Sequence, residues 1–207
     1  MITIKASTPE RAWRKSFLKL IEHGYPVEFN KFYLNETAAI EISNINIGLT
    51  SEFFPMDKDE IQNICKYLLT GLGTINHDWT KLYRKRLFEE EDHIINIIDT
   101  LKSWPDCPRA QIALWKNTDL DRNKIAPCLQ LLWFKIVDTK LHLHVHMRTS
   151  DCYGKLLMNF NEFICIQKYV ADSLKIEYGP YTHFIDSLHF HEKDKKEIKK
   201  LEKIIND

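Results

Sequence analysis

Apolar residues recur every three or four positions in five segments of the chain, which predicts a helix in each. The first helix is the best marked, because Thr8 can cap it, Pro9 suits its first turn and Gly24 can end it. The second begins at Asp57 or Asp59 and stops at Gly71. The other three segments are about 89–101, about 159–174 and the charged end of the chain, 192–207, whose apolar edge is Ile198, Leu201 and Ile205.

Stretches rich in β-branched and aromatic residues predict strands between these helices. Two long ones are joined by Asp138 and Thr139 and predict an antiparallel hairpin. The predicted strands are 33–49 with an irregularity, 110–115, 129–137, 141–148 and 182–190. No repeat, low-complexity tract or flexible linker interrupts the pattern, so we predict a single domain over residues 1–207.

Composition and charge exclude several classes of protein. The 207 residues carry 29 Lys and Arg against 29 Asp and Glu, and a chain without net charge is a poor non-specific binder of nucleic acid. No apolar run approaches the roughly 18–20 residues that span a bilayer, and the first residues lack the apolar core of a signal peptide. The five cysteines are scattered without CxxC spacing, which favours neither disulfides nor a zinc cluster. We therefore expect a cytoplasmic protein without membrane or nucleic-acid partners.

The predicted hairpin concentrates the residues capable of chemistry. Cys128 follows Ala126 and Pro127 at the start of a strand, where its thiol can face a cavity. A thiol becomes a nucleophile when a nearby cation stabilises its thiolate, although a lone cysteine is more often a small buried apolar residue.

Polar residues end the second strand of the hairpin. They supply one cation, two hydroxyls and a carboxylate from Arg148, Thr149, Ser150 and Asp151. This set could bind a phosphate monoester, and the alternative is a turn with a surface ion pair. Asn159 follows eleven residues after Arg148, and its amide can read a heterocycle or cap the helix that begins there.

A row of histidines occupies alternate positions of the second hairpin strand, so His142, His144 and His146 share one face. The outer two lie about 13 Å apart along a strand and cannot ligate one metal ion with the third, although a neighbouring strand could contribute ligands. We expect no metal site here. A polar, partly buried interface between two copies explains the row better, and its stability would be sensitive to pH.

Several segments taken together resemble thymidylate synthase and the related pyrimidine-nucleotide hydroxymethylases, especially the short archaeal-type members. The similarity runs from about Trp79 to Asp194, and the first predicted helix also looks like the one in those members. The matching segments are PDCPRAQIALW, APCLQLLWFKI, KLHLHVHMRTSDCY, NFNEFICIQKYVADSL and SLHFHEKD. The resemblance implies an α/β fold of the α+β type, with a large mixed sheet flanked by helices. It also implies a homodimer that shares its active sites, and 5,10-methylenetetrahydrofolate as the one-carbon donor.

The resemblance also implies a role for individual residues. Cys128 matches the nucleophile that adds to C6 of the pyrimidine, which makes C5 able to attack the one-carbon unit. Arg148 and Thr149 match phosphate ligands, and Arg148 in the family also lies near the thiol and lowers its pKa. The remaining matches are Arg109, lent across the dimer to the phosphate; Asp151, which seats the pyrimidine and folate; Asn159, which reads the base; His189, which binds the sugar; and Tyr83, in the wall of the site.

The chain departs from the family pattern at several of these positions. The catalytic glutamate of the second helix is missing near Asn63 or Ile64, and Glu60 is the nearest substitute. His191 replaces the tyrosine of the sugar-binding pair, and Lys31 is the nearest cation to a missing phosphate arginine. The other changes are Pro108 in place of the first of two arginines, Met147 in place of a glutamine, and the absence of the segment that closes over folate.

These departures leave the reaction open. A site without its closing segment favours attack by water and a hydroxymethyl product over hydride transfer and a methyl product. The altered histidine pair agrees with a ribonucleotide, while Asn159 favours uracil over cytosine, and we leave the base undecided. The alternative is a degenerate member that binds a nucleotide without turnover. A flavin-dependent synthase is disfavoured, because its arginine-rich motif is absent.

Overall fold

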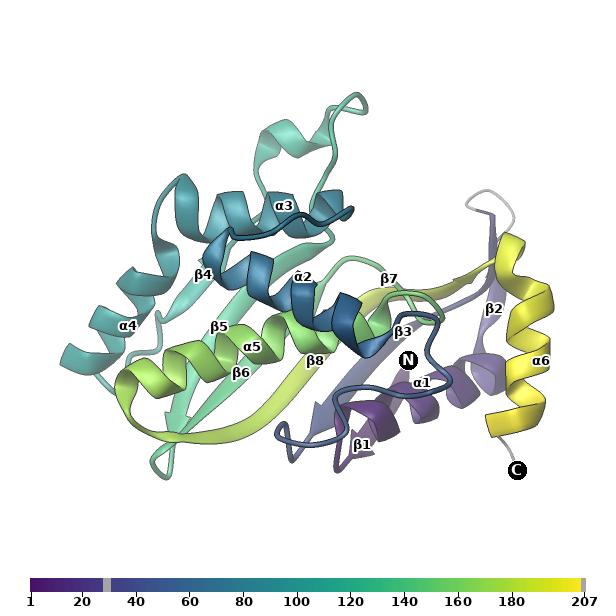
Figure 1. The fold of residues 1–207 in the computed structure, drawn as a ribbon, viewed down its shortest axis with the longest axis horizontal. Helices are drawn as coiled ribbons and strands as arrows, with labels where there is room; N and C mark the ends of the chain where they lie inside the picture. Colours follow the sequence, from purple (N-terminus) through teal and green to yellow (C-terminus); the bar gives the residue numbers. More distant parts are fainter. Residues whose placement is uncertain (28–30, 206–207) are drawn as a thin grey trace.

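A computed structural model describes residues 1–27 and 31–205, which form one mixed sheet with helices packed on it (Figure 1). The helices are α1 (Pro9–His23), α2 (Lys58–Thr70), α3 (Asp78–Arg84), α4 (His93–Ser103), α5 (Leu156–Leu174) and α6 (Lys195–Ile205). The strands are β1 (Ile2–Ala6), β2 (Tyr25–Val27), β3 (Phe32–Ile42), β4 (Gln111–Ala113), β5 (Leu129–Val137), β6 (Lys140–Met147), β7 (Ser150–Asp151) and β8 (Glu177–His191).

The sheet holds eight strands within the described residues, in the order β1-β3-β8-β6-β5-β4, with β2 beside β3 and β7 beside β8. β3 is antiparallel to β8, while β6 and β7 run parallel to it, so the sheet is mixed as expected. β8 therefore lies between β3 and β6, and its C-terminal residues pair with the short β7. The predicted α/β class with a large mixed sheet flanked by helices is confirmed.

Most predicted elements occur where the sequence places them. Thr8 caps α1 and accepts a hydrogen bond from the Arg11 backbone, and Gly71 ends α2 in the left-handed conformation (φ +70°). The hairpin of β5 and β6 is also present, and its turn residues Asp138 and Thr139 both have positive φ, as a tight hairpin turn requires.

Four elements differ from the prediction. β1 and α3 are not apparent in the sequence, because each is short and depends on packing: β1 pairs with β3, and α3 buries Thr80 and Tyr83. The helix predicted from about residue 89 begins at His93 with Asp92 as its cap, since residues 85–89 instead continue α3 as a π-helical turn. The fourth predicted helix begins at Leu156, so Asn159 lies inside it and does not cap it.

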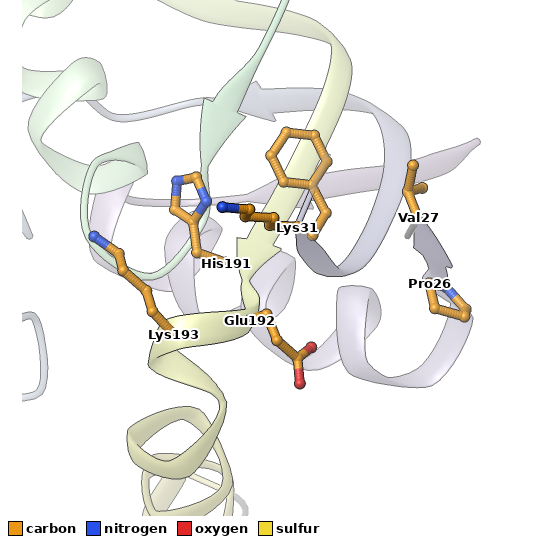
Figure 2. A pocket seen from close by; sticks show the side chains of 7 residues that line it. Pro26, Val27, Lys31, His191, Glu192 and Lys193 are labelled. Atoms are coloured by element: carbon orange, nitrogen blue, oxygen red, sulfur yellow. The ribbon is translucent and has the colours of Figure 1, made fainter. Parts of the chain in front are cut away.

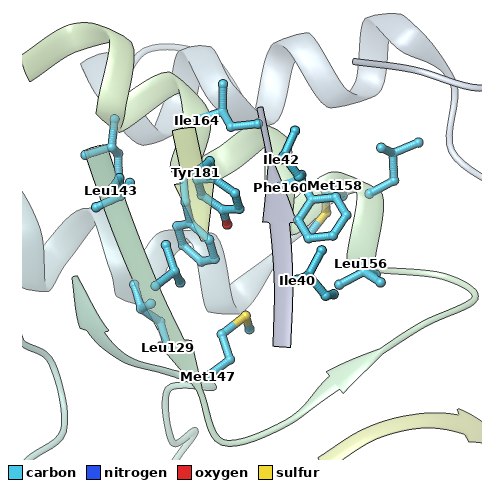
Figure 3. Packing of buried hydrophobic residues seen from close by; sticks show 14 of the residues in the cluster. Ile40, Ile42, Leu129, Leu143, Met147, Leu156, Met158, Phe160, Ile164 and Tyr181 are labelled. Carbon is cyan, nitrogen blue, oxygen red and sulfur yellow. The ribbon is translucent and has the colours of Figure 1, made fainter. Parts of the chain in front are cut away.

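The core lies between the sheet and α5, which crosses β6 and β8 (Figure 3). Leu143 and Met147 of β6 and Tyr181 of β8 point toward this helix and are almost completely buried. α5 in turn buries Phe160 and Ile164. Burial on nearly every side of α5 means that a polar residue there must find an internal partner.

The opposite face of the sheet is open. The three histidines of β6 are half-buried on this face, since they alternate with the fully buried Leu143 and Val145. His144 packs against Trp133, and Phe184 remains 44% exposed. Among residues 1–27 and 31–205, no three His, Cys, Asp or Glu side chains gather closely enough to hold a metal ion, and no helix is both long and apolar enough to cross a membrane.

Candidate functional site

A cavity of about 420 Å³ opens where β5, β6, β7 and β8 meet the first turn of α5. The strands bring together residues that are far apart in the sequence, because β7 pairs with β8 immediately after β6 ends. Eight of the residues predicted from the sequence line this cavity: Tyr83, Cys128, Arg148, Thr149, Asp151, Asn159, His189 and His191.

Cys128 lies just before β5, at the wall of the cavity and against the hydroxyl of Tyr83. The same hydroxyl accepts a hydrogen bond from the Leu129 backbone nitrogen (3.2 Å), which fixes the start of the strand. Burial raises the pKa of the Cys128 thiol above its usual value, and the Arg148 guanidinium opposes that rise. The cation therefore acts in the expected direction, but burial outweighs it, and the protein without ligand favours the neutral thiol at neutral pH.

Arg148 holds the loop that carries the cysteine. Its Nε donates to the carbonyl of Pro127 (3.0 Å), its terminal nitrogen donates to the carbonyl of Ala126 (3.3 Å), and its backbone nitrogen donates to the carbonyl of Cys128 (2.9 Å). Two lysines, Lys155 and Lys193, also line the cavity, so cations outnumber carboxylates there. This excess of positive charge suits an anionic ligand such as a phosphate.

Four neighbouring residues hold the His189 ring, and burial keeps it neutral. Burial lowers its pKa to about 4, its Nδ1 donates to the Ser187 carbonyl (3.2 Å), and its ring stacks on Phe32 at 3.8 Å. Thr149 Oγ1 lies 3.1 Å from the same Nδ1, and His191 Nε2 lies 3.4 Å from the other ring nitrogen. A neutral ring that donates through Nδ1 leaves Nε2 as an acceptor, which suits a ligand hydroxyl.

Asp151 begins the turn between β7 and α5. Its carboxylate accepts hydrogen bonds from the backbone nitrogens of Tyr153 (3.0 Å) and Gly154, which hold the turn closed. Burial raises the pKa of Asp151, and its side chain lines the cavity. The carboxyl group therefore fixes the turn and lies at the cavity wall at the same time.

Asn159 is 5% exposed, and both ends of its amide already have a partner. Ser150 Oγ donates to its Oδ1 (3.0 Å), while its Nδ2 donates to Glu162 (3.0 Å). Each end keeps one free hydrogen-bonding position, so the amide can offer one donor and one acceptor to a ligand in the cavity.

Glu162 is a residue that sequence reasoning missed. It is completely buried on α5, where burial raises its pKa to about 7, and it lies behind the cavity wall. A signal for it exists in the sequence, because a glutamate three residues after Asn159 shares its helix face, and that face is otherwise apolar. Thr80, His77 and Lys155, which join Glu162 in a chain of hydrogen bonds, carry no such signal.

Three other residues named from the sequence do not line this cavity. Glu60 is exposed on the first turn of α2, because only the Ile61 face of that helix turns inward, and it lines a separate hollow. Arg109 is exposed and follows Pro108, which lies at the open face of the sheet. Lys31 lines an adjoining hollow with His191 and Lys193, the last two of which also belong to the main cavity (Figure 2).

Comparison with known proteins gives two findings that agree with this geometry. Residues 28–205 match the family model described as thymidylate synthase. The chain is also 28% identical over 216 residues to a protein of Methanocaldococcus jannaschii described as a "putative thymidylate synthase", and the match covers 97% of this chain and 96% of the relative.

Proposed function

Because the chain belongs to the thymidylate synthase family, we propose that it transfers a one-carbon unit to C5 of a pyrimidine nucleoside 5′-monophosphate, with Cys128 as the nucleophile. One observation carries the proposal. The cavity holds a thiol, an arginine, a base-reading amide and a neutral histidine on its walls, namely Cys128, Arg148, Asn159 and His189. These groups match a pyrimidine, a phosphate and a sugar hydroxyl at once.

Cys128 would add to C6 of the pyrimidine and form a carbon–sulfur bond, which moves electron density to C5 and the ring carbonyl. Its raised pKa means that the thiol must lose its proton as the nucleotide binds. Arg148 lowers that pKa, and Tyr83 contacts the sulfur through its hydroxyl. Arg148 therefore has two tasks, since it also shapes the Ala126–Pro127 loop and supplies positive charge for the phosphate.

The residues present also fit 5,10-methylenetetrahydrofolate. Trp79 lines the cavity and is 42% exposed, so its indole offers a ring face to a flat heterocycle. Lys31 and Lys193 line the adjoining hollow and would attract the carboxylates of the folate tail. When bound, the folate supplies the one-carbon unit that C5 receives. Water that reaches the new carbon gives a hydroxymethyl product, and hydride gives a methyl product.

Two copies of the chain would complete each site. The open face of the sheet carries Trp133, His144 and the exposed Phe184, and a face that mixes aromatic with polar side chains is typical of a subunit interface. Arg109 is exposed and follows Pro108 of that face, so we infer that its side chain could extend into the partner's cavity. Mixing Cys128→Ser with Arg109→Ala subunits tests this arrangement: restored activity supports the shared site, and a mixture as inactive as its components contradicts it.

Release of tritium tests the reaction itself. We expect 5-tritiated UMP, dUMP, CMP or dCMP to lose tritium with methylenetetrahydrofolate, because substitution at C5 expels that hydrogen. Cys128→Ser should abolish the release, and mass spectrometry of the product separates methyl from hydroxymethyl. No release from any of the four, from a folded protein that still binds a nucleotide, would contradict the proposal and favour a binding protein without turnover.

A further inference from the structure

Glu162 has no access to the cavity, and its two oxygens are both occupied by donors. Thr80 Oγ1 donates to Oε1, and Asn159 Nδ2 donates to Oε2 (3.0 Å). Because an ionised carboxylate can only accept, it holds the Asn159 amide with its nitrogen toward Glu162 and its oxygen toward Ser150. The amide edge that faces the cavity is thereby fixed in one of its two orientations.

The direction of this hydrogen bond is set by a chain that starts at Lys155. The Lys155 ammonium donates to His77 Nε2 (2.7 Å), since an ammonium has only donors. The neutral His77 ring must then carry its proton on Nδ1, which donates to Thr80 Oγ1 (3.0 Å). Thr80 accepts that bond and so gives its own proton to Glu162. Every member of the chain therefore points toward the carboxylate.

We propose that Glu162 is a positioning residue that determines base specificity, because it fixes which end of the Asn159 amide faces each atom of the pyrimidine edge. The inference rests on the proposed function. Uracil presents a donor at N3 and an acceptor at position 4, whereas cytosine presents an acceptor and a donor at the same places. One amide orientation matches one base, and the reversed orientation matches the other.

A proton on Glu162 reverses the arrangement. With Oε1 still accepting from Thr80, a protonated Oε2 becomes a donor and requires the oxygen of Asn159 opposite it. Burial places the pKa of Glu162 at about 7, so both states are accessible near neutral pH. The titratable groups around Glu162 are two basic side chains, two thiols and two phenols. They are His77, Lys155, Cys128, Cys165, Tyr83 and Tyr181. Burial raises the pKa of Tyr83, Cys128 and Tyr181, and lowers the pKa of Lys155 and of His77, that of His77 to about 4. A hydrogen bond with Cys65, together with burial, raises the pKa of Cys165.

The substitution Glu162→Gln reproduces the protonated form at every pH. Thr80 requires the amide oxygen of the glutamine, so the glutamine nitrogen faces Asn159 and turns its amide around. We expect the ratio of the dissociation constants for UMP and CMP, or for their deoxy forms, to change by at least about tenfold toward the base that the wild type disfavours. The matched control is Glu22→Gln, which makes the same change on the exposed surface of α1 and should keep the wild-type ratio.

Calorimetric titration with each nucleotide separates the outcomes. A folded Glu162→Gln protein that keeps the wild-type ratio would overturn the specificity inference and leave the proposed function standing. Failure of the wild type to bind any of the four nucleotides would overturn both.

The wild type also provides a test that does not depend on the folding of a variant. The ratio of its dissociation constants for the uracil and cytosine nucleotides should shift between about pH 6 and about pH 8, as Glu162 loses its proton. Titration of the phosphate does not affect this ratio, because both nucleotides share the phosphate contacts. A ratio that is constant over this range would contradict the inference.

Discussion

Replacing Trp13 with phenylalanine should weaken the fold where the turn after β7, which lines the candidate site, rests on α1. Trp13 is completely buried, and its indole nitrogen donates to the carbonyl of Cys152 (2.8 Å), the residue after Asp151. Phenylalanine leaves that buried carbonyl without its partner, which costs about 1–3 kcal/mol. It also removes part of a buried ring that packs edge-on against Phe54, worth about 1–2 kcal/mol more.

We therefore expect Trp13→Phe to lower the free energy of unfolding by about 2–5 kcal/mol, measured by urea denaturation at one fixed protein concentration. Trp104→Phe is the matched control, because Trp104 is 45% exposed and should change stability by less than about 0.5 kcal/mol. Equal effects of the two substitutions would show that the indole–carbonyl bond does not hold the turn.

Three further predictions follow from burial and charge. Because burial raises the pKa of Cys128, iodoacetamide should label it more slowly than an exposed thiol near pH 8, and Arg148→Leu should slow labelling further; faster labelling, read by peptide mass spectrometry, would refute this. Arg86→Met should lower the free energy of unfolding by about 3–5 kcal/mol, since it leaves the buried carboxylate of Asp119 without its two 2.6 Å hydrogen bonds; a loss below about 1 kcal/mol in urea titration would contradict the burial argument. Burial lowers the folded-state pKa of His183 to about 3, so only the unfolded chain gains this proton as the pH falls below about 6.5, and the free energy of unfolding should fall by about 2 kcal/mol between pH 7 and pH 5. The melting temperature of His183→Asn should therefore fall less with acid than that of the wild type, and an equal fall would exclude His183 as the cause.

The hairpin illustrates why so much of the fold could be predicted from the sequence. β5 and β6 consist of residues with high strand propensity, and the turn between them, at Asp138 and Thr139, requires positive φ. The local sequence therefore specifies this hairpin. The same holds for α1 and α2, whose caps and stops are sequence signals. By contrast, β1 and α3 depend on partners distant in the chain, and no local pattern marks them.

The site shows a similar division. Cys128, Arg148 and Asn159 could be found because their spacing is that of a known family, and the cavity brings them together. Glu60 was named as the nearest substitute for the glutamate that the family resemblance expects on this helix, but its side chain is exposed at the start of α2 and lines a separate hollow. Glu162 has one sequence signal, its position three residues after Asn159, but its role depends on residues outside its own helical turn. Thr80 donates to it, His77 donates to Thr80, and Ser150 donates to the Asn159 amide that Glu162 holds.

The most direct test of the central claim is the mass of the protein after reaction with a 5-fluorinated pyrimidine nucleotide and methylenetetrahydrofolate. Fluorine at C5 cannot leave as a cation, so the reaction should stop with the nucleotide still bonded to the sulfur. We predict an adduct confined to the peptide that contains Cys128, formed with one base only and absent from Cys128→Ser. No adduct with either base, or an adduct on another cysteine, would contradict Cys128 as the nucleophile.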